Sequence, residues 1–114
     1  MGKAKDTHLS IGQATMMVEA YAITAASQRL GPEFAQAVEV ITDMSNSGRK
    51  LIFCGIGKSG HIGKKLSTTF MSAGISCTFL HASEAIHGDL GIYKPGDVTI
   101  ILSKSGSSAE IVRI

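Results

Sequence analysis

Two short segments of this chain carry the residue types that bind a phosphate group. The first is Gly55-Ile56-Gly57-Lys58-Ser59-Gly60 and the second is Ser103-Lys104-Ser105-Gly106-Ser107-Ser108. Each follows a short apolar run and precedes a helix-like pattern. Glycines, hydroxyls and a lysine at such a position can direct backbone N–H groups and side-chain donors at one anion. Together the two segments predict one phosphate site that is built from two loops.

The glycine spacing of the first segment excludes a triphosphate loop and leaves a dinucleotide site open. A Walker A loop needs a glycine five residues before Gly57, and that position holds Ile52. The dinucleotide fingerprint is met by Gly55, Gly57 and Gly60. However, Leu80-His81 stands where the acidic residue that binds ribose is expected. A sugar-phosphate site is the alternative that uses both segments, with hydroxyls and backbone as ligands.

Composition excludes several classes of protein. The 114 residues are 44% hydrophobic and 18% charged, as expected of a single domain with one core. A net charge of +2 and an aromatic content of 5% disfavour binding to a nucleic acid. Neither a signal peptide nor a membrane-spanning run is evident, so we expect a cytoplasmic protein without a membrane partner. Cys54 and Cys77 lack the spacing of a metal or redox pair and are interpreted as buried thiols.

Two helices precede the first predicted strand. Ser10 and Gln13 have the spacing of a capping box for a helix over 14–30. Pro32, at a first helical position, then begins a second helix over 33–47. The residues expected to face inward are Met17, Tyr21, Thr24 and Ala25 in the first helix, and Phe34, Val38, Ile41 and Met44 or Ser45 in the second.

Three strands and a crossover helix follow. Short apolar runs predict strands over 51–54, 75–80 and 98–102. A helix over 61–73 connects the first two strands, and a polar loop over 81–91 connects the last two. The residues of this helix that are expected to face inward are Ile62, Leu66, Phe70 and Ala73. This order favours parallel pairing in an α/β layer fold.

The residues in and around the two segments resemble the sugar isomerase (SIS) domain, and more narrowly the bacterial arabinose-5-phosphate isomerases. The resemblance rests on the stretches 55–63 (GIGKSGHIG), 84–91 (EAIHGDLG) and 102–110 (LSKSGSSAE). Such enzymes interconvert D-arabinose 5-phosphate and D-ribulose 5-phosphate for the synthesis of Kdo, a sugar of lipopolysaccharide or capsule. The resemblance implies a three-layer parallel-sheet fold, flavodoxin-like or Rossmann-like, preceded by two helices.

The resemblance also carries expectations about the extent of the domain and its assembly. It covers about residues 8–114, so we expect a polar tail over 1–9 and a partial SIS domain over 10–114 without CBS domains. Members of the family carry roughly the same length again, and we therefore expect the domain to be incomplete at Ile114. SIS domains generally form dimers or tetramers, which implies a homo-oligomer. Enediol chemistry needs no metal, and we expect neither a metal nor a cofactor.

Candidate site residues follow from the needs of aldose–ketose isomerisation. The reaction needs a phosphate anchor, help with ring opening, and a base that carries a proton between adjacent carbons through an enediolate. Lys58 can meet phosphate charge or a developing oxyanion. Histidine as a residue type can act as acid or base at neutral pH, so His87 is the candidate for ring opening. The resemblance implies that Glu110 is an acid/base residue. The anchor is assigned to Gly57, Ser59, Ser103, Ser105 and Ser108.

Structural explanations compete with these assignments. Serines are common in turns and caps, and Ser107 and Glu110 match a capping box that needs no ligand. His61 and His81 are ambiguous, and no histidine has the spacing of a strong metal template. A sugar-phosphate-binding domain without catalysis and a dinucleotide-binding domain therefore stay open as alternatives.

Overall fold

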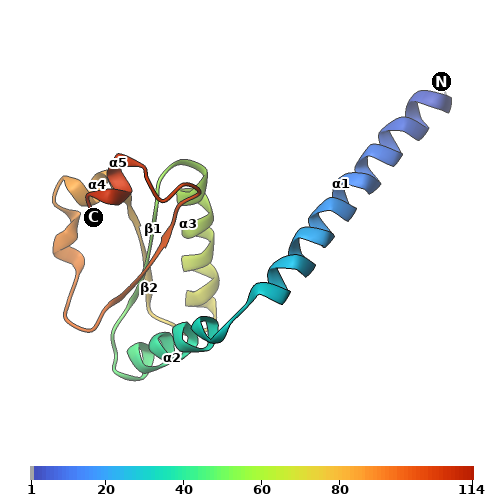
Figure 1. Cartoon of the computed structure of the whole chain (residues 1–114). Coiled ribbons are helices and arrows are strands. Elements are labelled where there is room, and N and C mark those ends of the chain that lie inside the picture. Colours follow the sequence, from blue (N-terminus) through green and yellow to red (C-terminus); the bar gives the residue numbers. More distant parts are fainter. Residues whose placement is uncertain (1) are drawn as a thin grey trace. The chain divides into compact units, whose positions relative to one another are not determined.

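The computed structural model describes residues 2–114 in two compact units, one up to Gln36 and one from Ala37 onward. The strands lie in the second unit, where they form one sheet (Figure 1). Within residues 2–114, no helix combines the length and the apolar character that a membrane span requires.

The first unit consists largely of helix α1, Gly2–Arg29. The prediction of a helix over 14–30 that is capped by Ser10 and Gln13 is wrong at its start, because the helix already begins at Gly2. Instead of capping the helix, the Ser10 hydroxyl donates to the carbonyl of Thr7 inside it (3.0 Å). The expected burial of Met17 and Tyr21 is also wrong, because no described residue of α1 is buried.

Helix α2 spans Pro32–Asn46 and confirms the predicted start at a proline. It ends before Gly48, whose φ of 70° lies in the left-handed region that suits the end of a helix. Met44 is buried, whereas Phe34 and Val38, which were also expected to face inward, are exposed. The difference arises because only the C-terminal half of α2 packs on the apolar cluster of the sheet.

The sheet has three parallel strands, as predicted. Their order is β2-β1-β3, with β1 over Leu51–Gly55, β2 over Cys77–His81 and β3 over Val98–Leu102. Every residue of the central strand β1 is buried. Cys54 in β1 is buried and Cys77 in β2 is half-buried, and burial raises the pKa of both thiols. The interpretation as a buried thiol is therefore confirmed for Cys54, whereas Cys77 is only half-buried.

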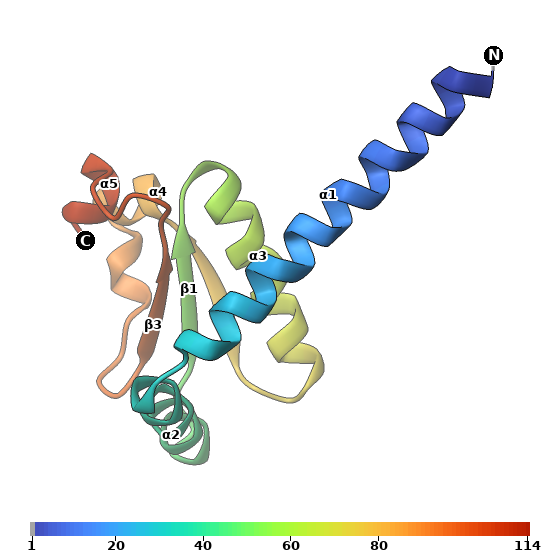
Figure 2. The same ribbon diagram turned by 45° about the vertical axis from the view of Figure 1, so that its right-hand side comes forward.

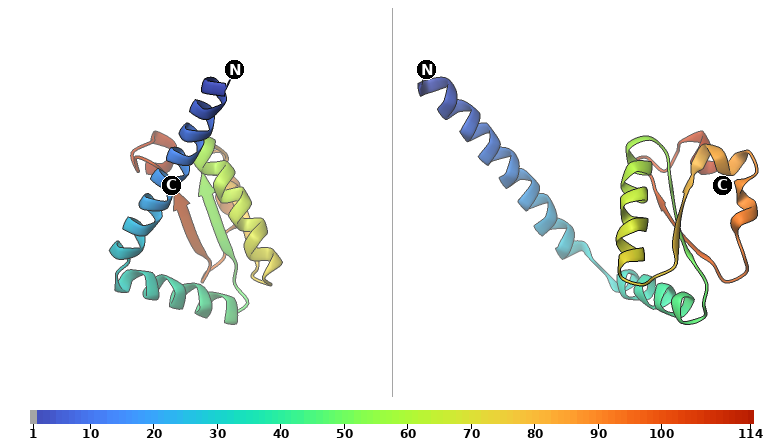
Figure 3. Two further views of the ribbon diagram at one scale, coloured as in Figure 1. Left: turned by 90° about the vertical axis from the view of Figure 1, so that its right-hand side faces the viewer. Right: turned by 180° about the vertical axis from the view of Figure 1, so that it is seen from behind.

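Helices cover both faces of the sheet and give the three expected layers (Figures 2 and 3). On one face, Leu51 and Phe53 pack with Met44 and with side chains of helix α3, which spans Gly57–Ser72. On the other face, the core residues are Ile52, Cys54, Leu80, Ala82 and Ala85, with Tyr93, Ile111 and Ile114 packed against them. The α/β fold class predicted from the order of elements is therefore confirmed.

The connection between β2 and β3 differs from the predicted polar loop over 81–91. It contains a short helix α4, Ala82–Ile86, and a 3-10 helix η1, Asp89–Ile92. Ala82 and Ala85 are both buried on the sheet, so apolar packing holds a segment whose sequence is mostly polar. The last helix, α5, spans Ala109–Val112.

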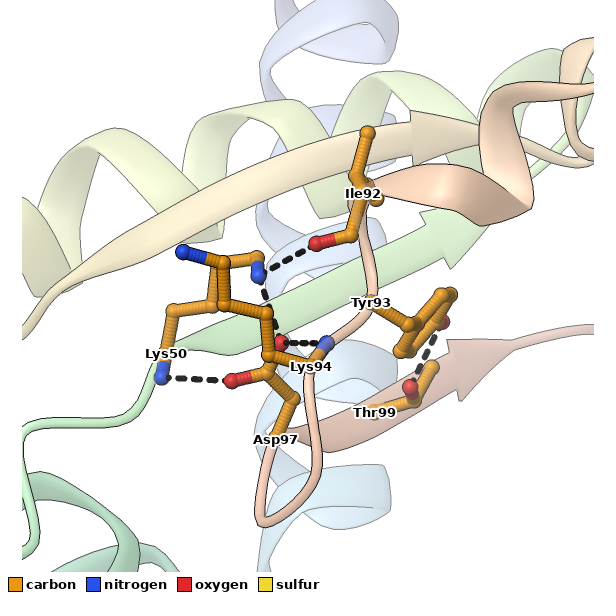
Figure 4. A network of polar contacts seen from close by, with 6 residues as sticks. All are labelled: Lys50, Ile92, Tyr93, Lys94, Asp97 and Thr99. Carbon is orange, nitrogen blue, oxygen red and sulfur yellow. Dashed lines mark hydrogen bonds and ion pairs between the residues drawn. The ribbon is translucent and has the colours of Figure 1, made fainter.

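An aspartate with a buried side chain ties the chain together at the amino ends of the strands (Figure 4). The Asp97 carboxylate accepts from the N–H of Lys50 (3.1 Å) and the N–H of Lys94 (2.8 Å), and it pairs with the Lys50 ammonium. The Lys50 ammonium also donates to the carbonyl of Ile92. The hydrogen bond from Lys50 is the main cause that lowers the pKa of Asp97 to about 2. This network joins the start of β1 to the turn before β3.

Candidate active site at the carboxyl ends of β1 and β3

The two phosphate-type segments leave the sheet from neighbouring strands. Gly55 at the end of β1 is paired in register with Leu102 at the end of β3. The chain after β1 enters α3 on one face of the sheet, while the chain after β3 leads to α5 on the other face (Figures 1 and 2). Such a divergence is a topological switch point, where open α/β sheets bind ligands. The structure therefore confirms that both segments lie at the same edge.

Most of the first segment is helical rather than a loop. Helix α3 begins at Gly57, four residues before the predicted start at His61. Its N-cap is Ile56, which makes no side-chain capping hydrogen bond and whose apolar side chain packs against the core. Along the start of α3, the first backbone N–H that donates to a backbone carbonyl is that of Gly60, which bonds to the carbonyl of Ile56 (3.2 Å). The first-turn N–H groups of α3 thus have no side-chain cap and are suited to an anion.

Glycines bring this helix unusually close to the sheet. A Cβ on Gly55 would lie 3.0 Å from the nitrogen of Gly60, and a Cβ on Gly60 would lie 3.3 Å from the carbonyl oxygen of Gly55. A Cβ on Gly63 would lie 3.3 Å from the ring of Phe79. Gly57 differs, because it has free space around it and instead adopts a φ of +59°. Gly57 therefore allows the sharp turn, and the other glycines allow the close packing.

The two side chains assigned in the first segment lie in the first turn of α3. Lys58 is exposed and Ser59 is half-buried. An exposed ammonium beside unbonded helix N–H groups adds positive charge where an anion would bind. The structure thus places both residues at the edge from which the second segment also departs.

The second segment is an ordered loop held by its own hydroxyls. The Ser103 hydroxyl accepts from the N–H of Gly106 (2.8 Å), and the Ser105 hydroxyl accepts from the N–H of Ser107 (3.2 Å). Gly106 has a φ of +69°, which a tight loop of this kind needs. Because both hydroxyls accept from the loop, each retains its own proton to donate to a ligand. The backbone N–H groups of Gly106 and Ser107 already donate to the two serine hydroxyls, so the serine side chains are the better donors to an anion.

The start of α5 corrects the capping-box interpretation. Ser108, not Ser107, is the N-cap, and its side chain makes no capping hydrogen bond. Glu110 is then the second helical residue rather than the third, so the reciprocal bonds of a capping box do not form. Both Ser108 and Glu110 are half-buried. The structural explanation that competed with a site role for Glu110 is removed.

His87 comes from the connection that was expected to be a loop. It is exposed and ends α4, where its N–H donates to the carbonyl of Glu84 (3.0 Å). Helices α4 and α5 contact each other, so His87 and Glu110 are carried by neighbouring elements on one face of the sheet. Lys58 is carried by α3, whose side chains pack on the other face.

His81 has a structural role that the sequence did not indicate. Its Nδ1 accepts from the N–H of Ser83 (3.3 Å) and lies 2.7 Å from the Ser83 hydroxyl, so His81 caps α4. Histidine is outside the usual set of N-cap residues, and only the short His-x-Ser spacing after a strand could have suggested it. His81 is also paired in register with Gly55, at the end of β2 where a dinucleotide site would need an acidic residue.

Comparisons with known proteins agree with this geometry. The sequence profile of the SIS domain matches residues 43–114. The chain is 44% identical over 107 residues to a Haemophilus influenzae protein named "probable arabinose 5-phosphate isomerase", covering 94% of this chain and 31% of that protein. It is 41% identical over 106 residues to arabinose 5-phosphate isomerase GutQ of Salmonella typhimurium, covering 93% of this chain and 32% of GutQ.

A solved structure shares the fold over most of the chain. An Escherichia coli CFT073 protein in complex with arabinose 5-phosphate has a TM-score of 0.83 at 37% identity, covering 92% of this chain and 54% of that one. The chain spans about a third of the length of the two curated relatives.

Proposed function

Because the chain belongs to the SIS domain family, we propose that it is the phosphate-binding part of an isomerase that interconverts D-arabinose 5-phosphate and D-ribulose 5-phosphate. The names of its relatives and the sugar-phosphate complex of a similar structure support this substrate. The proposal extends to the role in Kdo synthesis, to a homo-oligomer, and to the cytoplasm as its location. The activity belongs to the whole protein of which such a chain forms a part.

One observation carries the proposal: the uncapped start of α3 lies beside a serine loop at adjacent strand ends. Unbonded helix N–H groups and hydroxyls that retain a free proton are the donors that a phosphate dianion needs. In our proposal, Gly57 and Ser59 bind the phosphate from α3. Ser103, Ser105 and Ser108 bind it from the other side.

The remaining assigned residues would act on the sugar. We assign ring opening to His87, which can take the proton of the anomeric hydroxyl and give one to the ring oxygen. Glu110 would then remove the proton from C2 of the open aldose, forming an enediolate, and return it to C1, while a proton passes from the hydroxyl oxygen on C2 to the oxygen on C1 to give the ketose. Lys58 would stabilise the negative charge that develops on the oxygen of the enediolate. Each proton is thus conserved, and no cofactor enters the balance.

A binding measurement on this chain tests the proposal. Arabinose 5-phosphate at a hundredfold excess over its Kd should stabilise the fold by about 2.7 kcal/mol, seen as a rise in Tm. Ser105→Ala should abolish the rise, because it removes a ligand hydroxyl. The matched control Ser107→Ala removes an exposed hydroxyl of the same loop and should keep the rise. An unchanged Tm with wild-type chain, or a rise with NADH instead, would refute a sugar-phosphate site.

Turnover separates the enzyme from a domain that only binds. The formation of ribulose 5-phosphate by the whole protein, measured in a coupled assay, would support catalysis as well as binding. A full Tm rise with turnover at background would favour a sugar-phosphate-binding domain without catalysis. These outcomes leave the phosphate site intact in both cases, so they distinguish activity from binding.

A further inference from the structure

A cavity lies on the side of α3 that faces β2. It has a volume of about 160 Å³ and is lined by Gly57, Gly60, His61, Lys64, Phe79 and His81. In the sheet, β2 and β3 pair with opposite edges of β1. The cavity therefore lies on the other flank of the start of α3 from the serine loop that follows β3. The proposed sugar-phosphate site does not use its side chains.

The shape of this cavity follows from helical spacing and from glycine. Its four α3 residues occupy positions i, i+3, i+4 and i+7 from Gly57 and so share one face of the helix. A Cβ on Gly60 would lie 3.5 Å from Cζ of Phe79, so glycine keeps this space open. The Phe79 ring stands edge-on to the ring of His81, with centroids 6.4 Å apart. Phe79 thus fixes one wall, and His81 stands beside it.

The hydrogen bonds of His81 determine which of its ring nitrogens carries the proton. The N–H of Ser83 can only donate, and it bonds to Nδ1 of His81 (3.3 Å). Nδ1 must therefore accept, and the neutral ring carries its proton on Nε2. Because Ser83 occupies Nδ1, the ring nitrogen that remains for a ligand is a donor.

The charged and polar side chains of the cavity are all potential donors. Lys64 carries a positive charge, and His61 and His81 each offer a ring N–H. None of the six lining residues is acidic. A cavity with three donor side chains and no carboxylate attracts anions and repels cations.

We propose that this cavity is a second anion site, which binds the phosphate group of a small metabolite next to the sugar-phosphate site. Three donors that come from two different elements suit the three free oxygens of a phosphate ester better than the two oxygens of a carboxylate. Gly57 borders both sites, so the two anions bind on opposite flanks of one helix start. The proposal does not require the isomerase activity.

Inorganic phosphate and histidine NMR spectra test the proposal on the full chain. Titration should shift the ring resonances of His61 and His81 with saturation, while His8 in α1 stays unchanged. Lys64→Gln should weaken this binding roughly tenfold, because it removes the fixed charge. Lys65→Gln, an exposed neighbour that does not line the cavity, is the matched control and should leave the Kd unchanged. Both side chains are exposed, so folding is retained.

The variant Ser105→Ala separates the two sites. It should remove the Tm rise with arabinose 5-phosphate and leave the phosphate response of His61 and His81 intact. Loss of that response in Ser105→Ala would mean that phosphate binds only at the serine loop, which overturns the second site. Absence of a saturable response in wild-type chain, or an equal Kd in Lys64→Gln, would also overturn it. A stronger response to acetate than to phosphate would exclude the phosphate-ester ligand.

Discussion

Gly55 at the end of β1 and Gly60 in the first turn of α3 are in direct backbone contact, because neither residue has a side chain. A Cβ on Gly55 would approach the nitrogen of Gly60 to 3.0 Å. This contact fixes the position of the α3 N–H groups relative to the end of the strand. The phosphate site we propose therefore depends on two residues that have no polar side chain of their own.

We expect Gly55→Ala to weaken sugar-phosphate binding by displacing the start of α3. The added methyl group meets backbone, which cannot rotate away, so the variant should also lose roughly 1 to 3 kcal/mol of stability. Affinity for arabinose 5-phosphate and the Tm without ligand measure the two effects. Gly91→Ala is the matched control, since a Cβ there has open space and the φ of Gly91 is not positive. Equal affinity of Gly55→Ala and wild type would contradict the role of this contact.

Local signals in the sequence were sufficient for the strands and for several helix ends. The apolar run of β1 is buried on both faces, and Pro32 begins α2 as its fixed φ favours. Gly48 and Gly74 end helices with positive φ, which only glycine adopts readily. These features depend on a few neighbouring residues, and the parallel order of strands then followed from the crossover helix.

The start of α3 and part of its inward face could not be predicted from local signals. Glycines are poor helix formers and isoleucine is a poor N-cap, so Gly57–Gly60 indicated a loop. The predicted inward face is confirmed at Leu66 and Phe70, which pack against the apolar cluster. It is wrong at Ile62 and Ala73, which are exposed, while Gly63 and Ser67 are buried instead. Close contact with the sheet requires small residues on that face of the helix. The spacing of apolar residues along the sequence does not indicate where such contact occurs. Predicting it requires knowledge of the tertiary structure.

The proposed base Glu110 should be needed for turnover and not for binding. We expect Glu110→Gln to lower kcat by about 10² to 10⁴ fold with little change in KM, since the amide cannot take a proton. The Tm rise with arabinose 5-phosphate should persist. Glu84→Gln changes an exposed glutamate of α4 and is the matched control. Retention of kcat in Glu110→Gln would exclude this residue as the base.

The two cysteines should resist alkylation in the folded chain. Burial raises the pKa of both thiols, and the thiolate is the reactive form. Cys54 is buried and Cys77 is half-buried, so Cys77 should react first with iodoacetamide at neutral pH. Mass spectrometry of the modified peptides measures the order, and the urea-unfolded chain, in which both should react alike, is the control. Faster labelling of Cys54 would indicate that β1 opens in solution.

The Asp97 network should make the stability of the fold sensitive to acid. The pKa of Asp97 is about 2 in the folded chain, below its ordinary value of 3.8, mainly because of the hydrogen bond from Lys50. A lowered pKa means that the folded state favours the carboxylate. Its contribution to stability is therefore fully present above about pH 4 and is lost as the pH falls toward 2.

We expect Asp97→Asn to lower the Tm at pH 7 by roughly 5 to 10 °C, because it leaves the Lys50 ammonium without its partner. The difference in Tm between wild type and variant should shrink as the pH falls from 4 to 2, when the wild-type carboxyl also becomes neutral. Asp43→Asn, an exposed aspartate of α2, is the matched control and should follow wild type across this range. A Tm difference that stays constant down to pH 2 would show that the carboxylate charge does not stabilise the amino ends of the strands.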